Sequence, residues 1–171
     1  MKLVSVAEML TIEQEADASG LTYEKMMEYA GQGLAEAVQQ AYGHLPNQSV
    51  LGLVGSGNNG GDTLVALAHL LEGGWQATAL LVRPRKAKDA LVERVRKAGG
   101  QVLAADAGLL ADSAGLVELL GSQAVLLDGV LGTGVKLPLK TELGQALGLI
   151  RDILLEMDNP PKVVAVDCPS G

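Results

Sequence analysis

Aromatic and basic residues are scarce in this sequence. It contains no phenylalanine, one tryptophan and three tyrosines among 171 residues, which argues against a sheet that stacks RNA or single-stranded DNA bases. Its 13 Lys and Arg are outnumbered by 20 Asp and Glu, so the formal net charge is −7. That charge repels nucleic acid and anionic membranes. We therefore expect no nucleic-acid and no membrane partner, and any bound phosphate must be held by local groups.

Cysteine and histidine are also nearly absent. Cys168 is the single cysteine, so no internal disulfide can form, and we expect a protein of the reducing cytoplasm. His44 and His69 stand at positions unrelated to Cys168, which argues against a structural zinc site. The first eleven residues carry charges and no uninterrupted apolar run, so they indicate neither a secretory signal nor a membrane span.

What the sequence has in quantity is aliphatic side chains and glycine. Apolar residues make up 48 % of the chain, and 22 residues are glycine. This composition and length predict one globular domain over residues 1–171 with an aliphatic core. Because the chain stops one turn after a buried-looking apolar run at residues 163–166, we expect the domain to be incomplete at its C-terminal end.

The first third of the chain has a helical pattern. Apolar positions recur at helical spacing over residues 22–40, with most charged residues on the opposite side. Ahead of this segment, Ser5 and Glu8 form a capping-box pattern that predicts a helix over residues 5–18.

From residue 49 onward, short apolar runs alternate with helical segments. We expect strands at residues 49–54, 77–82, 101–104, 124–127 and 163–166, with helices near residues 63–71, 87–97, 109–120 and 143–156. Nearly continuous apolar strands are typical of parallel strands covered on both faces. The alternation predicts an α/β fold with a mostly parallel sheet.

The strongest local motif is GSGNNGGD at residues 55–62, between a predicted strand and a predicted helix. Its glycines free backbone N–H groups to approach a ligand, and a helix N-terminus favours a phosphate. Gly55, Gly57 and Gly60 satisfy the dinucleotide fingerprint. The alternative is a tight turn in which Asp62 caps the helix.

A conventional dinucleotide fold has an acidic residue about 20 positions later, at the end of the second strand. Here Arg83, Arg85 and Lys86 occupy that stretch. This departure argues against an ordinary NAD-dependent dehydrogenase. The basic run is more typical of a solvated loop than of a phosphate site, although it suits either.

Two further glycine turns follow predicted strands, at residues 128–134 (DGVLGTG) and 167–171 (DCPSG). Because the carboxyl ends of parallel strands share one edge, these turns and the first motif form a plausible single site. Asn58, Asn59, Asp128, Asp167 and Ser170 would supply hard oxygen ligands suited to a group I or II cation. Taken singly, each aspartate is equally compatible with a turn or cap.

These motifs, together with MEYAG at residues 27–31, resemble in order and spacing the NAD(P)H-hydrate epimerase family, also called the YjeF N-terminal domain. The resemblance implies a Rossmann-like three-layer αβα fold with N-terminal helices packed on a mostly parallel sheet. It also implies epimerisation of the R and S forms of the hydrated nucleotides NADHX and NADPHX, with a bound potassium ion. Tyr29 departs from the family, which commonly has Asn there.

The resemblance assigns roles residue by residue. Asp167 would be the catalytic residue and would also face the damaged ring of the substrate. Asn59, Asp128 and Ser170 would ligate potassium. Lys86 falls near a lysine sometimes given a catalytic role in relatives, but its loop aligns poorly. The remaining substrate contacts would come from Asn58, Asn59, Gly60, Gly61 and Asp62, and from Gly132, Thr133, Gly134, Val135, Lys136, Leu137 and Pro138.

Relatives suggest partners and rival functions. The resemblance is compatible with a homodimer and with an NAD(P)HX dehydratase, fused or separate. Two other readings remain at this point: a non-catalytic nucleotide-binding or scaffold module of the same fold, and a generic nucleotide-binding oxidoreductase. The retained Asp128, Asp167 and 58–62 motif favour the enzyme over a scaffold.

Overall fold

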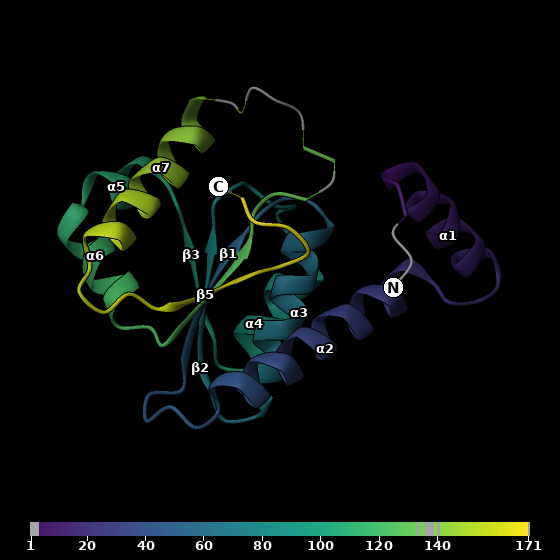
Figure 1. The fold of residues 1–171 in the computed structure, drawn as a ribbon, viewed down its shortest axis with the longest axis horizontal. Coiled ribbons are helices and arrows are strands. Elements are labelled where there is room, and N and C mark those ends of the chain that lie inside the picture. Colours follow the sequence, from purple (N-terminus) through teal and green to yellow (C-terminus); the bar gives the residue numbers. More distant parts are fainter. Residues whose placement is uncertain (1–3, 133, 136–138, 140, 171) are drawn as a thin grey trace.

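The computed structural model describes residues 4–132, 134–135, 139 and 141–170. Its centre is a five-stranded parallel sheet in the order β3-β2-β1-β4-β5 (Figure 1). The strands are β1 Ser49–Val54, β2 Gln76–Leu81, β3 Gln101–Ala104, β4 Val125–Gly129 and β5 Lys162–Ala165. All five predicted strands are confirmed, three of them shifted by one or two residues. From β1 the chain first adds strands on one side of the sheet (β2, β3) and then on the other (β4, β5). The point where the strand order reverses therefore lies between β1 and β4, and ligands of such sheets usually bind there.

Helices cover both faces of the sheet. On one side lie α2 Tyr23–Tyr42, α3 Asn58–Glu72 and α4 Ala90–Lys97, and on the other α5 Ala107–Ala111, α6 Ser113–Gly121 and α7 Thr141–Glu156 (Figure 1). The expected three-layer α/β architecture is therefore confirmed.

The predicted helices differ in bounds by one to three residues, except for two that differ more. The segment near residues 109–120 is two helices, because Asp112 ends α5 and its side chain accepts a hydrogen bond from the Gly115 N–H to cap α6. The helix expected from residue 63 begins at Asn58 instead. Residues 58–62 of the glycine motif are therefore helical and form the start of α3.

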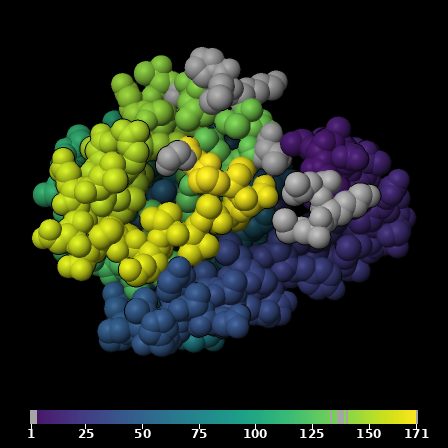
Figure 2. All heavy atoms as spheres, in the orientation of Figure 1, coloured from purple at the N-terminus to yellow at the C-terminus, as the bar shows by residue number. Residues whose placement is uncertain are grey.

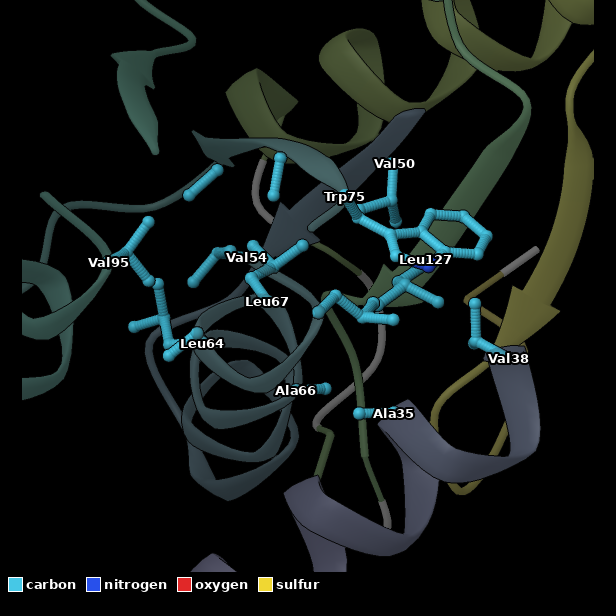
Figure 3. Packing of buried hydrophobic residues seen from close by; sticks show 14 of the residues in the cluster. Ala35, Val38, Val50, Val54, Leu64, Ala66, Leu67, Trp75, Val95 and Leu127 are labelled. Carbon is cyan, nitrogen blue, oxygen red and sulfur yellow. The ribbon is translucent and has the colours of Figure 1, made fainter. Parts of the chain in front are cut away.

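Two aliphatic clusters fill the space between the layers. One joins the sheet to α2, α3 and α4, and includes Trp75, which is 4 % exposed and packs near Val38 and Leu127 (Figure 3). The other joins the opposite face to α6 and α7 through residues such as Leu120 and Ile150. Alternate residues of β1 enter opposite clusters, as a strand covered on both faces requires.

The MEYAG segment packs α2 against the start of α3. A β-carbon at Gly31 would overlap Val65, and one at Gly61 would overlap the sulfur of Met27. These two glycines let the helices approach closely, and Met27 packs directly on Gly61 in the glycine motif. Tyr29 points away from this contact and is 63 % exposed.

The first helix, α1 Val6–Ala18, lies beyond the N-terminal end of α2, at the edge of the molecule (Figures 1 and 2). Its predicted capping box is present: the Ser5 hydroxyl accepts from the Glu8 N–H, and a Glu8 carboxylate oxygen accepts from the Ser5 N–H at 2.7 Å. Every residue of α1 is described, and none is buried. Among the described helices, none combines the length and apolar character that crossing a bilayer requires.

Candidate active site

A cavity of about 1180 Å³ opens at the carboxyl edge of the sheet. Its described wall includes the start of α3, the segments that follow β4 and β5, Arg83 after β2, and side chains of α1 and α2. The cavity lies at the switch between β1 and β4, the position expected for a ligand of a doubly wound sheet. The three glycine turns predicted to form one site thus meet around it.

Two glycines of the first motif, Gly55 and Gly60, are required by close packing. A β-carbon at Gly55 would overlap the carbonyl oxygen of Val130, and one at Gly60 would overlap that of Gly55. The N-cap, Gly57, supplies no side-chain acceptor to the first N–H groups of α3. Uncapped N–H groups and the positive end of the helix dipole favour an anion. Ser56, Gly57 and Asn58 bring this turn into the cavity wall.

Asn59 joins the three strand ends through one amide. Its Nδ2 donates to the carbonyl oxygens of Leu131 and Val166, both at 2.8 Å. Thr63 supports it from the next turn, because its hydroxyl donates to the Asn59 carbonyl at 2.7 Å. With both amide hydrogens engaged, the Asn59 side-chain oxygen is left facing the Gly132 segment.

Asp128 and Ser170 are joined beside the same segment. The Ser170 N–H donates to an Asp128 carboxylate oxygen at 2.6 Å, and the Ser170 hydroxyl accepts from the Leu131 N–H at 3.0 Å. Asp128 is only 8 % exposed. Asn59, Asp128 and Ser170 therefore converge around Leu131 and present one carboxylate, one amide oxygen and one hydroxyl. Among the described residues, no three His, Cys, Asp or Glu side chains gather as a metal site.

Asp167 lies at the end of β5 in a strained turn. Its φ is 69°, the single positive value among the described non-glycine residues, and the Cys168 N–H donates to the Val166 carbonyl at 2.9 Å across it. This hydrogen bond closes a three-residue turn of a rare and strained type. Non-glycine residues held in the left-handed region often mark functional sites. The turn places Asp167 in the cavity wall.

A second carboxyl group of the wall has an altered acidity. Burial raises the pKa of Asp62 from its ordinary 3.8 to about 6, and the negative charges of Asp167 and Glu13 contribute further. Glu13 belongs to α1, so the outlying helix also affects the cavity. Arg83 is a basic residue of the same wall. The cavity wall thus combines the uncapped N-terminus of α3 with a group of carboxylates.

Cys168 is half-buried beside this group. Burial raises the pKa of its thiol, and the charges of Asp167 and Asp128 act in the same direction. A raised pKa leaves less thiolate at neutral pH, which makes Cys168 a poor nucleophile.

Comparison with known proteins identifies the family. The family model described as "YjeF-related protein N-terminus" matches residues 23–171. The chain belongs to this YjeF N-terminal family. Its sequence is 36 % identical to an NAD(P)H-hydrate epimerase of Microbacterium testaceum, across 85 % of this chain and 52 % of the relative. It is 30 % identical to another of Cenarchaeum symbiosum, across 98 % of this chain and 74 % of that one.

A longer relative and a solved structure also match this chain. A bifunctional NAD(P)H-hydrate repair enzyme of Moorella thermoacetica is 34 % identical across all of this chain, which spans 32 % of that protein. The crystal structure of yeast ynu0 superposes with a TM-score of 0.81, at 23 % identity, across all of this chain and 72 % of its own. This likeness confirms the fold. The chain thus spans between a third and three quarters of the lengths of these proteins.

The fold brings most of the residues assigned from the YjeF resemblance to one place. Asp128 and Ser170 are joined to each other but are not among the described residues of the wall, and Gly60 and Gly61 are buried in packing contacts. Lys86 is exposed and is not among the described residues of the wall. Thr133, Lys136, Leu137 and Pro138 lie outside the described residues. The wall itself contains Asn58, Asn59, Asp62, Gly132, Gly134, Val135 and Asp167.

Several residues at the YjeF site were not anticipated from the sequence. Thr63 holds Asn59, and Glu13 reaches the cavity from α1. Arg85 was read as part of a solvated basic loop, yet its side chain is 12 % exposed and bonded to the glycine turn. No spacing rule singles out these three residues, because their roles depend on contacts between distant segments.

Proposed function

We propose that this chain interconverts the R and S forms of the hydrated nicotinamide nucleotides NADHX and NADPHX. Membership of the YjeF N-terminal family supports this proposal, since relatives at 36 % and 30 % identity are named NAD(P)H-hydrate epimerases. The single observation that carries it is Asp167, a carboxylate in a strained turn of a cavity that also contains an uncapped helix N-terminus.

The cavity suits a charged dinucleotide. Its volume of about 1180 Å³ is larger than the roughly 300–1,000 Å³ typical of pockets for drug-sized ligands. We assign the phosphates to the turn at Ser56, Gly57 and Asn58, where N–H groups and the helix dipole compensate negative charge. The hydrated ring would then extend toward the ends of β4 and β5, beside Asp167. This arrangement separates the anionic part of the ligand from the carboxylates.

The reaction inverts a carbon that bears both a hydroxyl group and the ring nitrogen. Protonation of the hydroxyl and departure of water leave a cation stabilised by the nitrogen lone pair. Water then adds from the opposite face and loses a proton, so the atoms balance and only the configuration changes. Alternatively the bond between this carbon and the ring nitrogen breaks to leave an aldehyde and an N–H group, and the nitrogen then adds to the opposite face of the aldehyde, which restores the hydroxyl with inverted configuration. In either route Asp167 exchanges the proton and stabilises the developing positive charge.

A potassium ion fits the donor set beside the cavity. Asn59, Asp128 and Ser170 would hold it, because they offer an amide oxygen, a buried carboxylate and a hydroxyl, the hard donors that such cations prefer. When bound, potassium would supply positive charge that orders the loops after β4 and β5. The protein's own Asn59 amide already ties those loops together, so the ion would reinforce an existing arrangement.

Two partner expectations also stand as proposals. Relatives described as bifunctional repair enzymes support a second activity that consumes one epimer, which we assign to an NAD(P)HX dehydratase, fused or separate. A homodimer is compatible with the resemblance and is kept here as a proposal.

The proposed activity predicts that this chain accelerates the interconversion of R and S NADHX above the spontaneous rate. Separated epimers would be incubated with the protein and followed by chromatography, with potassium chloride compared against sodium chloride at equal ionic strength. We expect faster exchange with protein, and the fastest with potassium. NADPHX would be measured in parallel.

A folded protein that leaves the spontaneous rate unchanged would refute the epimerase proposal. Folding would be checked by the emission of Trp75, whose burial gives a signal distinct from the unfolded chain. Acceleration of equal size in sodium and potassium would retain the enzyme and refute the potassium assignment alone.

A further inference from the structure

The segment between β2 and α4 contains a partly buried ion pair that the proposed chemistry does not use. Arg85 donates from Nε to an Asp89 carboxylate oxygen at 2.7 Å, and each side chain is only 12 % exposed. Burial opposes the ionisation of Asp89, yet the hydrogen bond from Arg85 holds the pKa of Asp89 below its ordinary value. A pair so little exposed and so well matched differs from an ordinary surface salt bridge.

The other end of Arg85 contacts the glycine turn. Its Nη1 donates to the carbonyl oxygen of Gly55 at 2.7 Å and lies 3.4 Å from that of Gly57. Asp89 in turn caps α4, because its second carboxylate oxygen accepts from the Leu91 N–H at 2.9 Å. The start of α4 is thereby linked through two side chains to the turn at the start of α3.

Arg85 acts on this turn from outside the cavity. Ser56, Gly57 and Asn58 belong to the described cavity wall, whereas Arg85 does not. In a trans peptide the carbonyl and the following N–H point in opposite directions. Drawing the carbonyls of Gly55 and Gly57 toward Arg85 therefore turns the N–H groups of Ser56 and Asn58 away from it. Those are the groups to which we assigned the phosphates.

We propose that Arg85, oriented by Asp89, is a positioning residue that fixes the glycine turn for binding the substrate's phosphates. The proposal rests on the nucleotide-binding function proposed above. A guanidinium group can bond Asp89 and a backbone carbonyl at once through its planar set of donors, whereas a lysine ammonium acts as a point charge. A turn that is held in place before the ligand arrives loses less conformational entropy on binding, so the ligand binds more tightly.

The test compares Arg85→Lys and Asp89→Asn with the unaltered protein. Asparagine still caps a helix as well as aspartate does, so Asp89→Asn weakens the Arg85 pair without removing the cap of α4. Losing a hydrogen bond that involves a charged group predicts a rise in KM for NADPHX of about tenfold or more in either variant, with a smaller change in kcat. Lys88→Gln is the matched control, because Lys88 is an exposed cation of the same segment.

Hydrogen exchange provides a readout that does not require activity. We expect backbone amides of residues 55–62 to exchange faster in both variants, while β1 and β4 stay protected and Lys88→Gln matches the unaltered protein. Unchanged exchange in residues 55–62 of folded Arg85→Lys would overturn the positioning role. Faster exchange in a protein that shows no epimerase activity even unaltered would leave the positioning role standing and count against the proposed function.

Discussion

At the scale of single residues, Asp167 stands out because its conformation is unfavourable. A left-handed backbone costs most residues about 1–2 kcal/mol, and aspartate and asparagine tolerate it better than others. The N–H of Cys168 and the carbonyl of Val166 close the turn and hold Asp167 at its φ of 69°. The turn thus fixes the backbone that carries the Asp167 carboxylate at the carboxyl edge of the sheet. A flexible backbone at this position would orient the carboxylate less precisely.

Substituting Asp167 separates its charge from its conformation. Asp167→Asn keeps a residue that tolerates φ above zero but removes the carboxylate, so we expect an intact fold and a loss in epimerisation rate of about 100-fold or more. Asp167→Ala also loses that tolerance, so it should be less stable than Asp167→Asn by about 1 kcal/mol. Rates come from chromatography and stabilities from urea denaturation. A folded Asp167→Asn with the unaltered rate would exclude Asp167 from the chemistry.

At the scale of elements, the sequence predicts strands better than it predicts where α3 begins. The strand β1 was expected at its observed bounds because an apolar run covered on both faces has few other conformations. The first turn of α3 contains Asn58, Asn59 and Gly60, which are weak helix formers. Its helical conformation is imposed by contacts with the ends of β1, β4 and β5, which no local pattern displays.

The same limit explains the residues of the site that were missed. The basic run after β2 shows that cations are present, but not that Arg85 turns inward to Gly55 while Lys86 stays exposed. The glycine turns themselves were predictable, since each follows an apolar strand and must reach the same edge. What the sequence leaves open is which side chain of each turn bonds to which backbone group.

The close approach at Gly60 gives a stability prediction for α3. A methyl group there would overlap the Gly55 carbonyl, so Gly60→Ala should destabilise the fold by about 1–3 kcal/mol, as overpacking usually does. Gly148→Ala in α7 is the matched control, because among the described residues nothing lies within 4 Å of a β-carbon there. Removing a helical glycine should stabilise by about 0.5–1 kcal/mol. Urea titration followed by Trp75 emission measures both, and a neutral Gly60→Ala would show that the turn can shift.

At the scale of the whole molecule, the acidic charge continues into the cavity. The chain carries a formal net charge of −7, and the negative charges of Asp167 and Glu13, from two other segments, act on Asp62. In the unfolded chain these groups are dispersed and solvated. Folding therefore brings like charges together, and it does so where the proposed cationic intermediate would form.

This arrangement predicts a particular pH dependence of stability. Because the pKa of Asp62 rises from 3.8 to about 6 on folding, Asp62 is protonated in the native state but ionised in the unfolded chain between about pH 4 and pH 6. Stability from this group therefore falls as the pH rises from about 4 through 6, and stays low above that. Asp62→Asn removes the effect, so its melting temperature should exceed that of the unaltered protein at pH 8, with the gain shrinking toward pH 4.

The control for this measurement is Asp158→Asn, which removes an exposed carboxylate that is not among the described residues of the cavity wall. It should show no comparable gain at pH 8. Equal melting curves for Asp62→Asn and the unaltered protein at pH 8 would contradict the electrostatic origin of the penalty.

The amide of Asn59 has a consequence for the order in which the molecule assembles. Its two hydrogen bonds join it to Leu131, which lies 72 positions later in the chain, and to Val166, which lies 107 positions later. Closing such long loops is slow, because their entropy is lost before their contacts form. A chain emerging from the ribosome can complete β1 and α3 early, but this junction must wait until β5 is made and docked. The proposed nucleotide site therefore depends on β5, and a chain that has not yet docked β5 lacks this junction.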